Sequence, residues 1–367
     1  MTESFINKIN LLNELSDRTF FYKSWSAPSN IALAKYWGKK DNQIPQNPSV
    51  SFTLNTCRTN MTVICAPKKS ADATRSFYFN NEKNNNFGKK AFKLVDIVAS
   101  DYPILNQYDL QLITENTFPH SSGIASSASS MSALALCLCD LLTEMDSSVD
   151  LVKGEFFKLA SHYARLGSGS ACRSIYGGVV QWGSSDFTLG SSDRYAVQIE
   201  NVHPIFCHFR DSVLIVSSDE KSVSSTAGHG QMDNHPFRDV RYMNATKNCK
   251  NIIDLMKGGN LWEWGELVEK EALELHGLMM NGPESFILLK PNTLNIIEKI
   301  RSFRRDNKIP VFFTLDAGPN VHVLYPDENK SVVEHFIKNS LIEYCENGIW
   351  FNDYVGIGPE KISEKSC

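Results

Sequence analysis

Alternating hydrophobic and polar positions predict strands in the first part of the chain. A helix-like pattern over residues 3–16 precedes them. Alternation starts at Thr19 and predicts a strand that ends at Ala27-Pro28-Ser29, because proline has no N–H to donate to a ladder. The same period of two predicts further strands over residues 49–55, 61–66, 75–79 and 108–115.

Hydrophobic positions spaced three and four residues apart predict helices between and after these strands. They cover residues 87–100, an apolar segment that begins near Ala128, and residues 151–166, where Gly167 ends the helix. Later patterns predict strands over residues 195–199, 212–216, 311–315 and 321–325, and helices over residues 240–256, 261–279 and 293–307. Helices and strands are therefore expected in both halves of the chain.

The length of the chain predicts two domains, because 367 residues exceed the size at which single cores stop growing. A polar stretch that contains Gly183 and Gly190 is the candidate boundary, so the predicted domains cover residues 1–190 and 191–367. The net charge of −4 argues against a nucleic-acid partner, whose binding domain would be strongly basic. Any anionic ligand must therefore be bound by locally placed lysines and arginines.

The cysteine pattern favours packed, reduced thiols. There are nine cysteines, an odd number, and the close pair Cys137 and Cys139 lies on the apolar helix. No Cys-x-x-Cys or His-x-x-x-His spacing points to a zinc site. The N-terminus lacks a basic start followed by an apolar run, and Asp140 interrupts the longest apolar helix. We therefore expect a cytoplasmic protein with no membrane partner.

A loop rich in serine and glycine precedes the apolar helix and is typical of a phosphate cradle. Gly123 allows a tight turn, after which N–H groups at the start of the helix point toward an anion. The hydroxyls of Ser126, Ser127 and Ser129 are suited to phosphate oxygens or to a phosphate-bound Mg²⁺. Alternatively, the stretch is a serine-rich linker that caps a core helix, since no P-loop or dinucleotide-binding pattern is present.

Three other segments carry candidate chemistry. Lys35 and Lys39 flank aromatic residues and suit a polyanion, although a solvated basic turn gives the same pattern. Arg173 lies in a loop of small residues between Gly167 and Gly178, where its guanidinium can bind a carboxylate or phosphate with two hydrogen bonds, unless the loop is a plain surface turn. Asp316 follows a buried strand and is placed either as a general base or as the cap of its own turn.

Short motifs lie in one collinear order over about residues 24–325. They are Ala27-Pro-Ser-Asn-Ile-Ala with Lys35-Tyr-Trp-Gly-Lys39, Glu115-Asn-Thr-Phe-Pro with Gly123-Ile-Ala-Ser-Ser, Gly167-Ser-Gly-Ser-Ala-Cys-Arg-Ser, Val223-Ser-Ser-Thr, and Asp316-Ala-Gly-Pro-Asn. Together they are similar to the mevalonate diphosphate decarboxylase family of the GHMP kinase superfamily.

The resemblance implies a two-domain α+β fold of the GHMP kinase type, with the active site in the cleft between the domains, and a homodimer. It also implies the reaction. ATP, with Mg²⁺, phosphorylates the tertiary 3-hydroxyl of (R)-5-diphosphomevalonate, and loss of phosphate with CO₂ leaves isopentenyl diphosphate. A tertiary hydroxyl leaves poorly, whereas a phosphate ester can be expelled by the electrons of the carboxylate, provided that cations neutralise the crowded phosphates.

The same resemblance implies roles for individual residues. Asp316 is the base or orienting group for the 3-hydroxyl, Arg173 holds the region of the substrate carboxylate, and Lys35 stabilises the transferring phosphoryl group. The implied contacts to diphosphomevalonate are Tyr36, Trp37, Gly38, Lys39, Arg75, Ser168, Gly169, Ser170, Ala171, Cys172, Arg173 and Thr226. The implied contacts to ATP are Gly123, Ala125, Ser126, Ser127 and Ser129, with Ser127 also on the metal.

The chain departs from the usual pattern of the family at two places. His120 begins a His-Ser-Ser triplet where small apolar residues are usual, and His229 replaces a usual methionine, so both bear on loop closure or nucleotide fit. Rival interpretations are a kinase of the superfamily that stops at phosphoryl transfer, a decarboxylase of the monophosphate, and a catalytically silent nucleotide-binding module.

Overall fold

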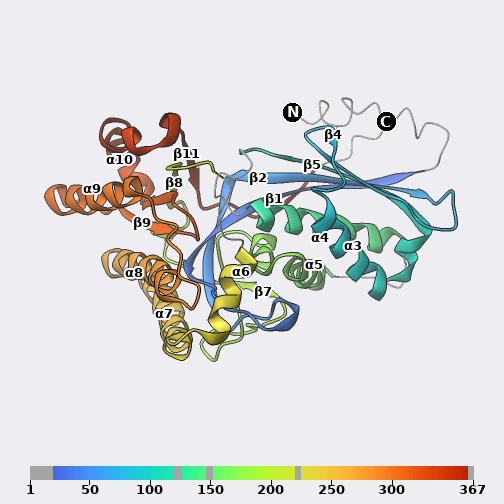
Figure 1. The fold of residues 1–367 in the computed structure, drawn as a ribbon, viewed down its shortest axis with the longest axis horizontal. Helices are drawn as coiled ribbons and strands as arrows, with labels where there is room; N and C mark the ends of the chain where they lie inside the picture. Colours follow the sequence, from blue (N-terminus) through green and yellow to red (C-terminus); the bar gives the residue numbers. More distant parts are fainter. Residues whose placement is uncertain (1–19, 119–125, 146–151, 220–224, 363–367) are drawn as a thin grey trace.

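The computed structural model describes residues 20–118, 126–145, 152–219 and 225–362, which form two β-sheets with helices packed around them (Figure 1). The predicted helix over residues 3–16 lies outside the described residues. The larger sheet has the strand order β12-β1-β2-β5-β3-β4, and β6 joins it between β2 and β7. Its strands are β1 (Phe21–Ala34), β2 (Ser49–Pro67), β3 (Arg75–Phe79), β4 (Glu82–Lys83), β5 (Tyr108–Asn116), β6 (Val179–Trp182), β7 (Ala196–Gln198) and β12 (Glu360–Lys361).

The strand β1 does not end at Pro28, as the sequence predicts, but continues to Ala34. Pro28 pairs with Arg58 of β2, and the register shifts between Pro28 and Asn30. Such an irregularity accommodates a residue that donates no amide hydrogen without ending the strand. The predicted strands 49–55 and 61–66 are likewise one strand, β2, which pairs with β6 near its start and with β5 near its end.

The smaller sheet is antiparallel and has the strand order β11-β8-β10-β9. Its strands are β8 (Arg210–Leu214), β9 (Phe312–Leu315), β10 (Val321–Tyr325) and β11 (Trp350–Tyr354). The carboxylate of Asp353 on β11 ties this sheet to β2, because it accepts hydrogen bonds from the N–H groups of Asn55, Thr56 and Cys57 at 2.8, 2.8 and 2.7 Å. The patterns predicted β8, β9 and β10, whereas β11 was not predicted.

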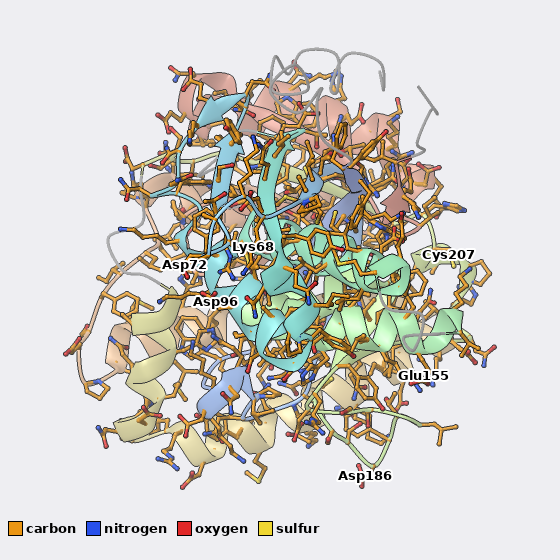
Figure 2. The ribbon with its side chains drawn as sticks, turned by 90° about the vertical axis from the view of Figure 1, so that its right-hand side faces the viewer. Lys68, Asp72, Asp96, Glu155, Asp186 and Cys207 are labelled. Atoms are coloured by element: carbon orange, nitrogen blue, oxygen red, sulfur yellow. The ribbon has the colours of Figure 1, made fainter. Side chains whose placement is uncertain are left out.

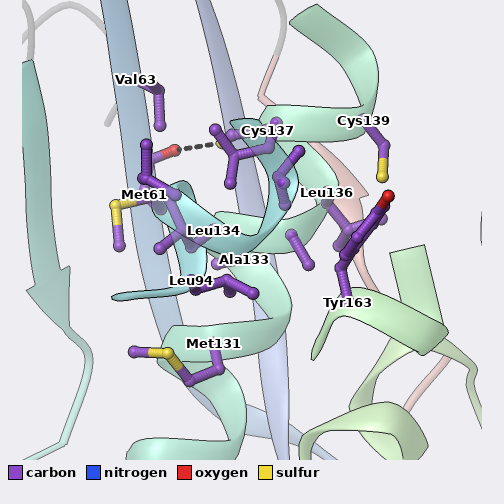
Figure 3. Packing of buried hydrophobic residues seen from close by; sticks show 14 of the residues in the cluster. Met61, Val63, Leu94, Met131, Ala133, Leu134, Leu136, Cys137, Cys139 and Tyr163 are labelled. Carbon is purple, nitrogen blue, oxygen red and sulfur yellow. Dashed lines mark hydrogen bonds between the residues drawn. The ribbon is translucent and has the colours of Figure 1, made fainter. Parts of the chain in front are cut away.

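The helices α3 (Lys89–Asp101), α4 (Ser126–Met145) and α5 (Lys153–Gly167) lie along one face of the larger sheet (Figure 1). They enclose an apolar core in which the Cys137 thiol donates to the Met61 carbonyl at 3.3 Å (Figure 3). Among the described residues, α4 is long and apolar enough to cross a membrane, but 78% of its apolar stretch is buried within the protein. The pattern of apolar residues in α4 is thus accounted for by core packing.

A second core joins β1 and β2 to the later helices. The ring of Trp264 lies 5.9 Å from that of Phe52 on β2 and 5.0 Å from that of Phe209. The remaining α-helices are α6 (Ser225–Gly230), α7 (Arg238–Gly258), α8 (Leu261–Asn281), α9 (Pro291–Asn307) and α10 (Lys330–Phe336). Short 3₁₀ segments are η1 (Asp41–Gln43), η2 (Pro103–Gln107), η3 (Gly169–Ile175), η4 (Pro204–Phe206), η5 (Gln231–Asn234), η6 (Asp327–Asn329), η8 (Ile342–Tyr344) and η9 (Glu346–Gly348), and η7 (Ile337–Leu341) is a π-turn.

Candidate active site

Lys35 follows the last residue of β1 and is 1% exposed. Its ammonium donates hydrogen bonds to the Ala32 carbonyl at 2.6 Å and to Asp316 Oδ1 at 3.2 Å. Burial lowers the pKa of the Lys35 ammonium, and the facing Asp316 carboxylate opposes that shift. A buried lysine therefore meets a carboxylate that comes from the far end of the chain.

Asp316 begins the turn between β9 and β10. Its carbonyl accepts hydrogen bonds from the Gly318 N–H at 2.7 Å and from His276 Nε2 at 3.0 Å. The side chain of Asp316 is 31% exposed, compared with 2% for that of Lys35. The turn is therefore fixed through its backbone, while the carboxylate faces both Lys35 and solvent.

Arg173 lies in η3 and is almost fully buried. It donates from Nη1 to Ser49 Oγ at 2.5 Å and from Nε to Asn30 Oδ1 at 3.3 Å. Burial lowers the pKa of the Arg173 guanidinium, and Cys172 and then Asp316 oppose the shift. Arg173 also contributes to lowering the pKa of Lys35. The structure thus brings Lys35, Arg173 and Asp316 together, as the interpretation of their motifs requires.

Asn30 was not predicted as a site residue, although its side chain is hydrogen-bonded to Arg173. It donates from Nδ2 to Ser174 Oγ at 2.8 Å and to the Ser170 carbonyl at 3.2 Å, and it accepts from Arg173. The signal was present in the sequence, because an asparagine stands between a proline and an apolar run close to Lys35. Asn30 was overlooked because the strand was predicted to end at Pro28, whereas β1 continues to Ala34.

A buried ion pair between α7 and α8 holds the backbone of Lys35 and was also missed. Glu271 Oε2 accepts from the Lys35 N–H and from Arg241 Nη2, both at 2.9 Å. Arg241 Nη2 also donates to the Lys35 carbonyl at 3.0 Å. Both charged side chains are 0% exposed. Charged residues on amphipathic helices usually belong to the solvated face, so their pattern gave no signal of this contact.

His229 of α6 packs on the segment that follows Lys35. Its ring centroid lies 4.4 Å from that of Tyr36 and 4.6 Å from that of Trp37, and its Nδ1 accepts from the Gly38 N–H at 3.0 Å. Burial, together with the charge of Lys39, lowers the pKa of His229 to about 3. The imidazole is therefore neutral and serves as a hydrogen-bond acceptor.

Tyr36, Gly38 and Lys39 belong to the same segment, which bonds to His229 through the Gly38 N–H. Gly38 has φ +88°, and a Cβ there would lie 2.3 Å from the Tyr242 hydroxyl oxygen, so the position requires glycine. Lys39 is half-buried, and its ammonium donates to Gln43 Oε1 at 3.0 Å. The Tyr36 hydroxyl is buried and has no hydrogen-bond partner among the described residues. An orphaned hydroxyl beside a lysine fits a polar ligand that supplies the missing partner.

Family models match both parts of the chain that meet in this arrangement. Residues 27–196 match the diphosphomevalonate decarboxylase-like N-terminal domain, and residues 212–353 match the mevalonate 5-diphosphate decarboxylase C-terminal domain. The chain belongs to the mevalonate diphosphate decarboxylase family. Lys35 and Arg173 lie within the first match and Asp316 within the second.

Relatives of known function agree with this assignment over most of their length. The chain is 29% identical to the diphosphomevalonate decarboxylase of Debaryomyces hansenii, over 86% of this chain and 82% of the relative. It is 27% identical to that of Schizosaccharomyces pombe, over 96% and 89%. The mevalonate diphosphate decarboxylase structure from Staphylococcus aureus has a TM-score of 0.80 at 27% identity and covers 94% of this chain and 99% of that chain. The two-domain α+β fold of the GHMP kinase type is therefore confirmed.

A related solved structure carries ligands. MDDEF in complex with MVAPP, AMPPCP and magnesium has a TM-score of 0.78 at 28% identity, and the likeness covers 94% of this chain and 100% of that chain. The TM-score is also 0.78, at 27% identity, for a structure of the decarboxylase from Enterococcus faecalis.

Of the residues that the family resemblance implies for ATP, Gly123 and Ala125 lie outside the described residues. Ser126 and Ser127 open the helix α4. The exposed Ser127 hydroxyl lies 3.4 Å from that of Ser168, so the ATP segment and the substrate segment meet here. Ser129 is different: its hydroxyl is buried and hydrogen-bonded to Thr59 Oγ1 at 2.7 Å. A side chain that is engaged inside the core fits the predicted phosphate contact poorly.

The segment from Ser168 to Arg173 is not the open loop that the sequence suggested, because Gly169–Ile175 forms the 3₁₀ segment η3. Small residues permit this close packing: a Cβ on Gly169 would lie 3.0 Å from the Tyr36 hydroxyl oxygen, and the Ala171 carbonyl accepts from Ser132 at 2.7 Å. The half-buried Ser170 bonds through its carbonyl to Asn30. Burial raises the pKa of the Cys172 thiol to about 12, which argues against a nucleophilic cysteine.

Arg75 and Thr226 are two further residues that the resemblance implies for the substrate. The Arg75 guanidinium on β3 pairs with Asp96 of α3, which is labelled in Figure 2, and donates to the Phe92 carbonyl at 3.4 Å. These contacts join Arg75 to α3, and its described hydrogen bonds and ion pairs do not include Lys35 or Asp316. Thr226, the last residue of the motif Val223-Ser-Ser-Thr, lies in α6.

Proposed function

We propose that this protein catalyses the ATP-dependent decarboxylation of (R)-5-diphosphomevalonate to isopentenyl diphosphate, with release of ADP, phosphate and CO₂, in the mevalonate pathway. The observation that carries the proposal is the contact of Lys35 with Asp316, beside Arg173, between the two segments that match decarboxylase family models. The same three residue types meet the needs of the reaction: a base, a cation for the phosphoryl group, and a planar donor for a carboxylate.

Asp316 handles the proton of the 3-hydroxyl. Its carboxylate is held through the backbone of the turn and is partly open to solvent, so it can accept a hydrogen bond from the hydroxyl and take the proton as the oxygen–phosphorus bond forms. Lys35 stabilises the charge that the phosphoryl group develops, since its ammonium is desolvated and cannot be screened by water.

Arg173 orients the carboxylate that is lost as CO₂. Among the described residues, hydrogen bonds engage its Nε and Nη1, which leaves Nη2 for the substrate. When the carbon–carbon bond breaks, its electrons form the new double bond, and the carbon–oxygen bond to phosphate breaks with them. Fixing the carboxylate keeps both breaking bonds aligned.

ATP and Mg²⁺ fit the start of α4. Ser126 and Ser127 open a helix of 20 residues, whose N-terminal amides and dipole favour an anion, and the Ser127 hydroxyl is exposed there. Within the described ranges, no cluster of three or more His, Cys, Asp or Glu side chains is suited to hold a metal. Mg²⁺ would therefore be held mainly by phosphate oxygens, with Ser127 as the protein ligand, and would supply charge neutralisation.

The experiment mixes the purified full-length chain with ATP, Mg²⁺ and either diphosphomevalonate or its monophosphate, each labelled with ¹⁴C at the carboxyl carbon. Release of labelled CO₂ and ADP in equal amounts from the diphosphate is expected. ADP without CO₂ would reduce the protein to a kinase, turnover of the monophosphate alone would change the substrate, and turnover of neither would leave a silent nucleotide-binding module.

We also propose that the protein is a cytoplasmic homodimer. The support is its likeness to the family, together with the charge and composition of the chain. Sedimentation velocity of the purified chain would show a single species near twice the chain mass of 41.2 kDa, and a monomer at micromolar concentration would contradict the assembly. Fractionation of cells that express the native protein tests the location.

A further inference from the structure

One helix, α8, contacts both partners of the Lys35–Asp316 ion pair. Glu271 accepts the Lys35 N–H at 2.9 Å, and His276 bonds to the Asp316 carbonyl at 3.0 Å. The side chains of both α8 residues are buried, at 0% and 1% exposure. A single helix therefore contacts the main chain of both residues whose side chains form the ion pair.

On the Lys35 side, the contact is made at both polar groups of the backbone. Glu271 binds the Lys35 N–H, and Arg241, its ion-pair partner on α7, donates to the Lys35 carbonyl at 3.0 Å. The other oxygen of Glu271 accepts from Arg241 at 3.0 Å and from Asn248 at 2.7 Å. With its oxygens occupied in this way, Glu271 has little freedom to move, and neither has the backbone of Lys35.

On the Asp316 side, the contact is also made at the backbone. A carbonyl oxygen only accepts, so His276 Nε2 carries the hydrogen in this bond. The Gly318 N–H donates to the same carbonyl at 2.7 Å. Because His276 binds the main chain, this contact does not use the Asp316 carboxylate, which faces Lys35.

A second buried carboxylate on α8, that of Glu269, forms an ion pair with another helix and provides a comparison for Glu271. Glu269 is 3% exposed and pairs with Arg304 and Arg301 of α9. Its described contacts do not include Lys35, Arg173 or Asp316. Glu271 and Glu269 are therefore alike in burial and charge but differ in their partners, because Glu271 bonds to the Lys35 backbone and Glu269 bonds to α9.

We infer that α8 sets the distance between the Lys35 ammonium and the Asp316 carboxylate, and that Glu271, Arg241 and His276 are positioning residues for proton removal and phosphoryl transfer. The inference rests on the proposed function for its chemistry, but the geometry that it assigns to α8 is independent of the substrate. Loss of either anchor lets one partner of the ion pair shift, and a shift of about 1 Å is enough to cost a factor of roughly 100 in rate.

The first test compares two variants of one residue. His276→Leu fills the volume without a donor, whereas His276→Gln offers an amide N–H near the former Nε2. We expect His276→Leu to lower kcat by about 10- to 100-fold with KM for diphosphomevalonate within about threefold, and His276→Gln to stay within about threefold of wild-type kcat. Wild-type kcat in His276→Leu, or equal losses in both variants, would overturn the role of His276.

The second test compares two carboxylates of the same helix. Glu271→Gln and Glu269→Gln each remove one charge of a buried ion pair, so both should lower Tm. Only Glu271→Gln should lower kcat, by about 100-fold, when both are assayed well below their Tm. Equal kcat values in the two variants would refute the inference. If Glu271→Gln does not fold, the pair of His276 variants decides.

A crystal structure of His276→Leu separates this inference from the proposed function. We expect the Lys35 Nζ to Asp316 Oδ1 distance to depart from 3.2 Å, whatever the protein turns over. An unchanged distance and turn would sink the inference even if the wild-type chain releases CO₂. A wild-type chain that releases no CO₂, with a displaced Asp316 in the variant, would instead sink the function and keep the role of α8.

Discussion

The Lys35 ammonium lies 3.2 Å from the Asp316 carboxylate, although 281 positions separate the two residues in the chain. One is nearly inaccessible, and the other is partly open. This asymmetry suits a pair in which the lysine fixes charge while the aspartate exchanges a proton with a reactant. It also makes the two residues separable by mutation.

Replacing Asp316 with Asn should abolish most turnover and leave nucleotide binding intact. The amide cannot accept the proton of a hydroxyl, and loss of a positioned base costs about 10²-fold or more. Release of CO₂ measures the loss, and titration with a fluorescent ATP analogue measures binding. Asp327→Asn, which removes a carboxylate paired with Arg210 on the surface, is the control and should keep its activity. Near-normal turnover in Asp316→Asn would remove this residue from the mechanism.

Replacing Arg173 with Lys should be nearly as damaging as removing the charge. The three donors of an ammonium share one nitrogen, so a lysine cannot reproduce the planar fork that bonds to Asn30 through Nε and to Ser49 through Nη1 while it presents Nη2 to a carboxylate. We expect kcat/KM for diphosphomevalonate to fall by about 100-fold or more, since roughly 3 kcal/mol of charge-assisted bonding is lost. Steady-state kinetics with each substrate varied in turn check this. Unchanged kinetics would count against the role of Arg173 on the carboxylate.

The two serines of α4 should respond differently to alanine. Ser127 is exposed at the start of the helix, so Ser127→Ala should raise KM for ATP and weaken the dependence on Mg²⁺. Ser129 donates or accepts within the core, so Ser129→Ala should lower the free energy of unfolding by about 1 kcal/mol and leave KM for ATP unchanged. The opposite assignment of the two effects would restore Ser129 as an ATP contact.

His229 should make the protein less stable in mild acid. Its pKa is about 3 in the folded state, below the usual 6.5, so the unfolded chain binds a proton first as the pH falls. The stabilisation is complete above pH 6.5 and is lost progressively between 6.5 and 3, by about 2 kcal/mol at pH 5. Urea unfolding at pH 7.5 and pH 5 measures this loss. His229→Gln keeps an acceptor for Gly38 without titrating, so its unfolding free energy should change less with pH. A wild-type pH dependence in His229→Gln would contradict the assignment.

Arg75 should prove less important to turnover than the family resemblance implies. Its guanidinium is engaged by Asp96, whose side chain is 64% exposed, on the α3 side of the larger sheet. Arg75→Ala should change kcat/KM by less than about tenfold and cost at most about 1 kcal/mol of stability, the usual range for a solvent-screened pair. If the variant stays folded and its kcat/KM nevertheless falls by about 100-fold or more, Arg75 must leave Asp96 to bind substrate.

The parts of the fold that could be predicted are those with local signals. The run of apolar residues in α4, the alternation in β5 and the turn at Asp316 each depend on neighbours in sequence. Pro28 shows the limit, because whether a proline ends a strand depends on a register that the partner strand determines. The short helix α10 has too few residues for a helical period to show, and β11 (Trp350–Tyr354) lacks the apolar–polar alternation that indicates a strand.

The candidate site could be predicted as far as its residues carry motifs. Lys35, Arg173 and Asp316 lie in glycine- or aromatic-rich segments that stand out from their surroundings. Glu271 and Arg241 do not stand out, because a charged residue on a long helix looks the same whether it faces water or a buried backbone. Only the packing of α7 and α8 against the end of β1 decides between these cases.

The separation of Lys35 from Asp316 along the chain has a consequence for synthesis on the ribosome. A nascent chain that has emerged only to residue 300 already contains α4, Lys35 and Arg173, but it lacks the carboxylate that pairs with the lysine. A charged amine in such a place cannot be buried cheaply on its own, so the incomplete chain should keep the end of β1 hydrated. The Lys35–Asp316 pair would then form only in the last stage of folding, and a truncated chain that lacks Asp316 would be inactive.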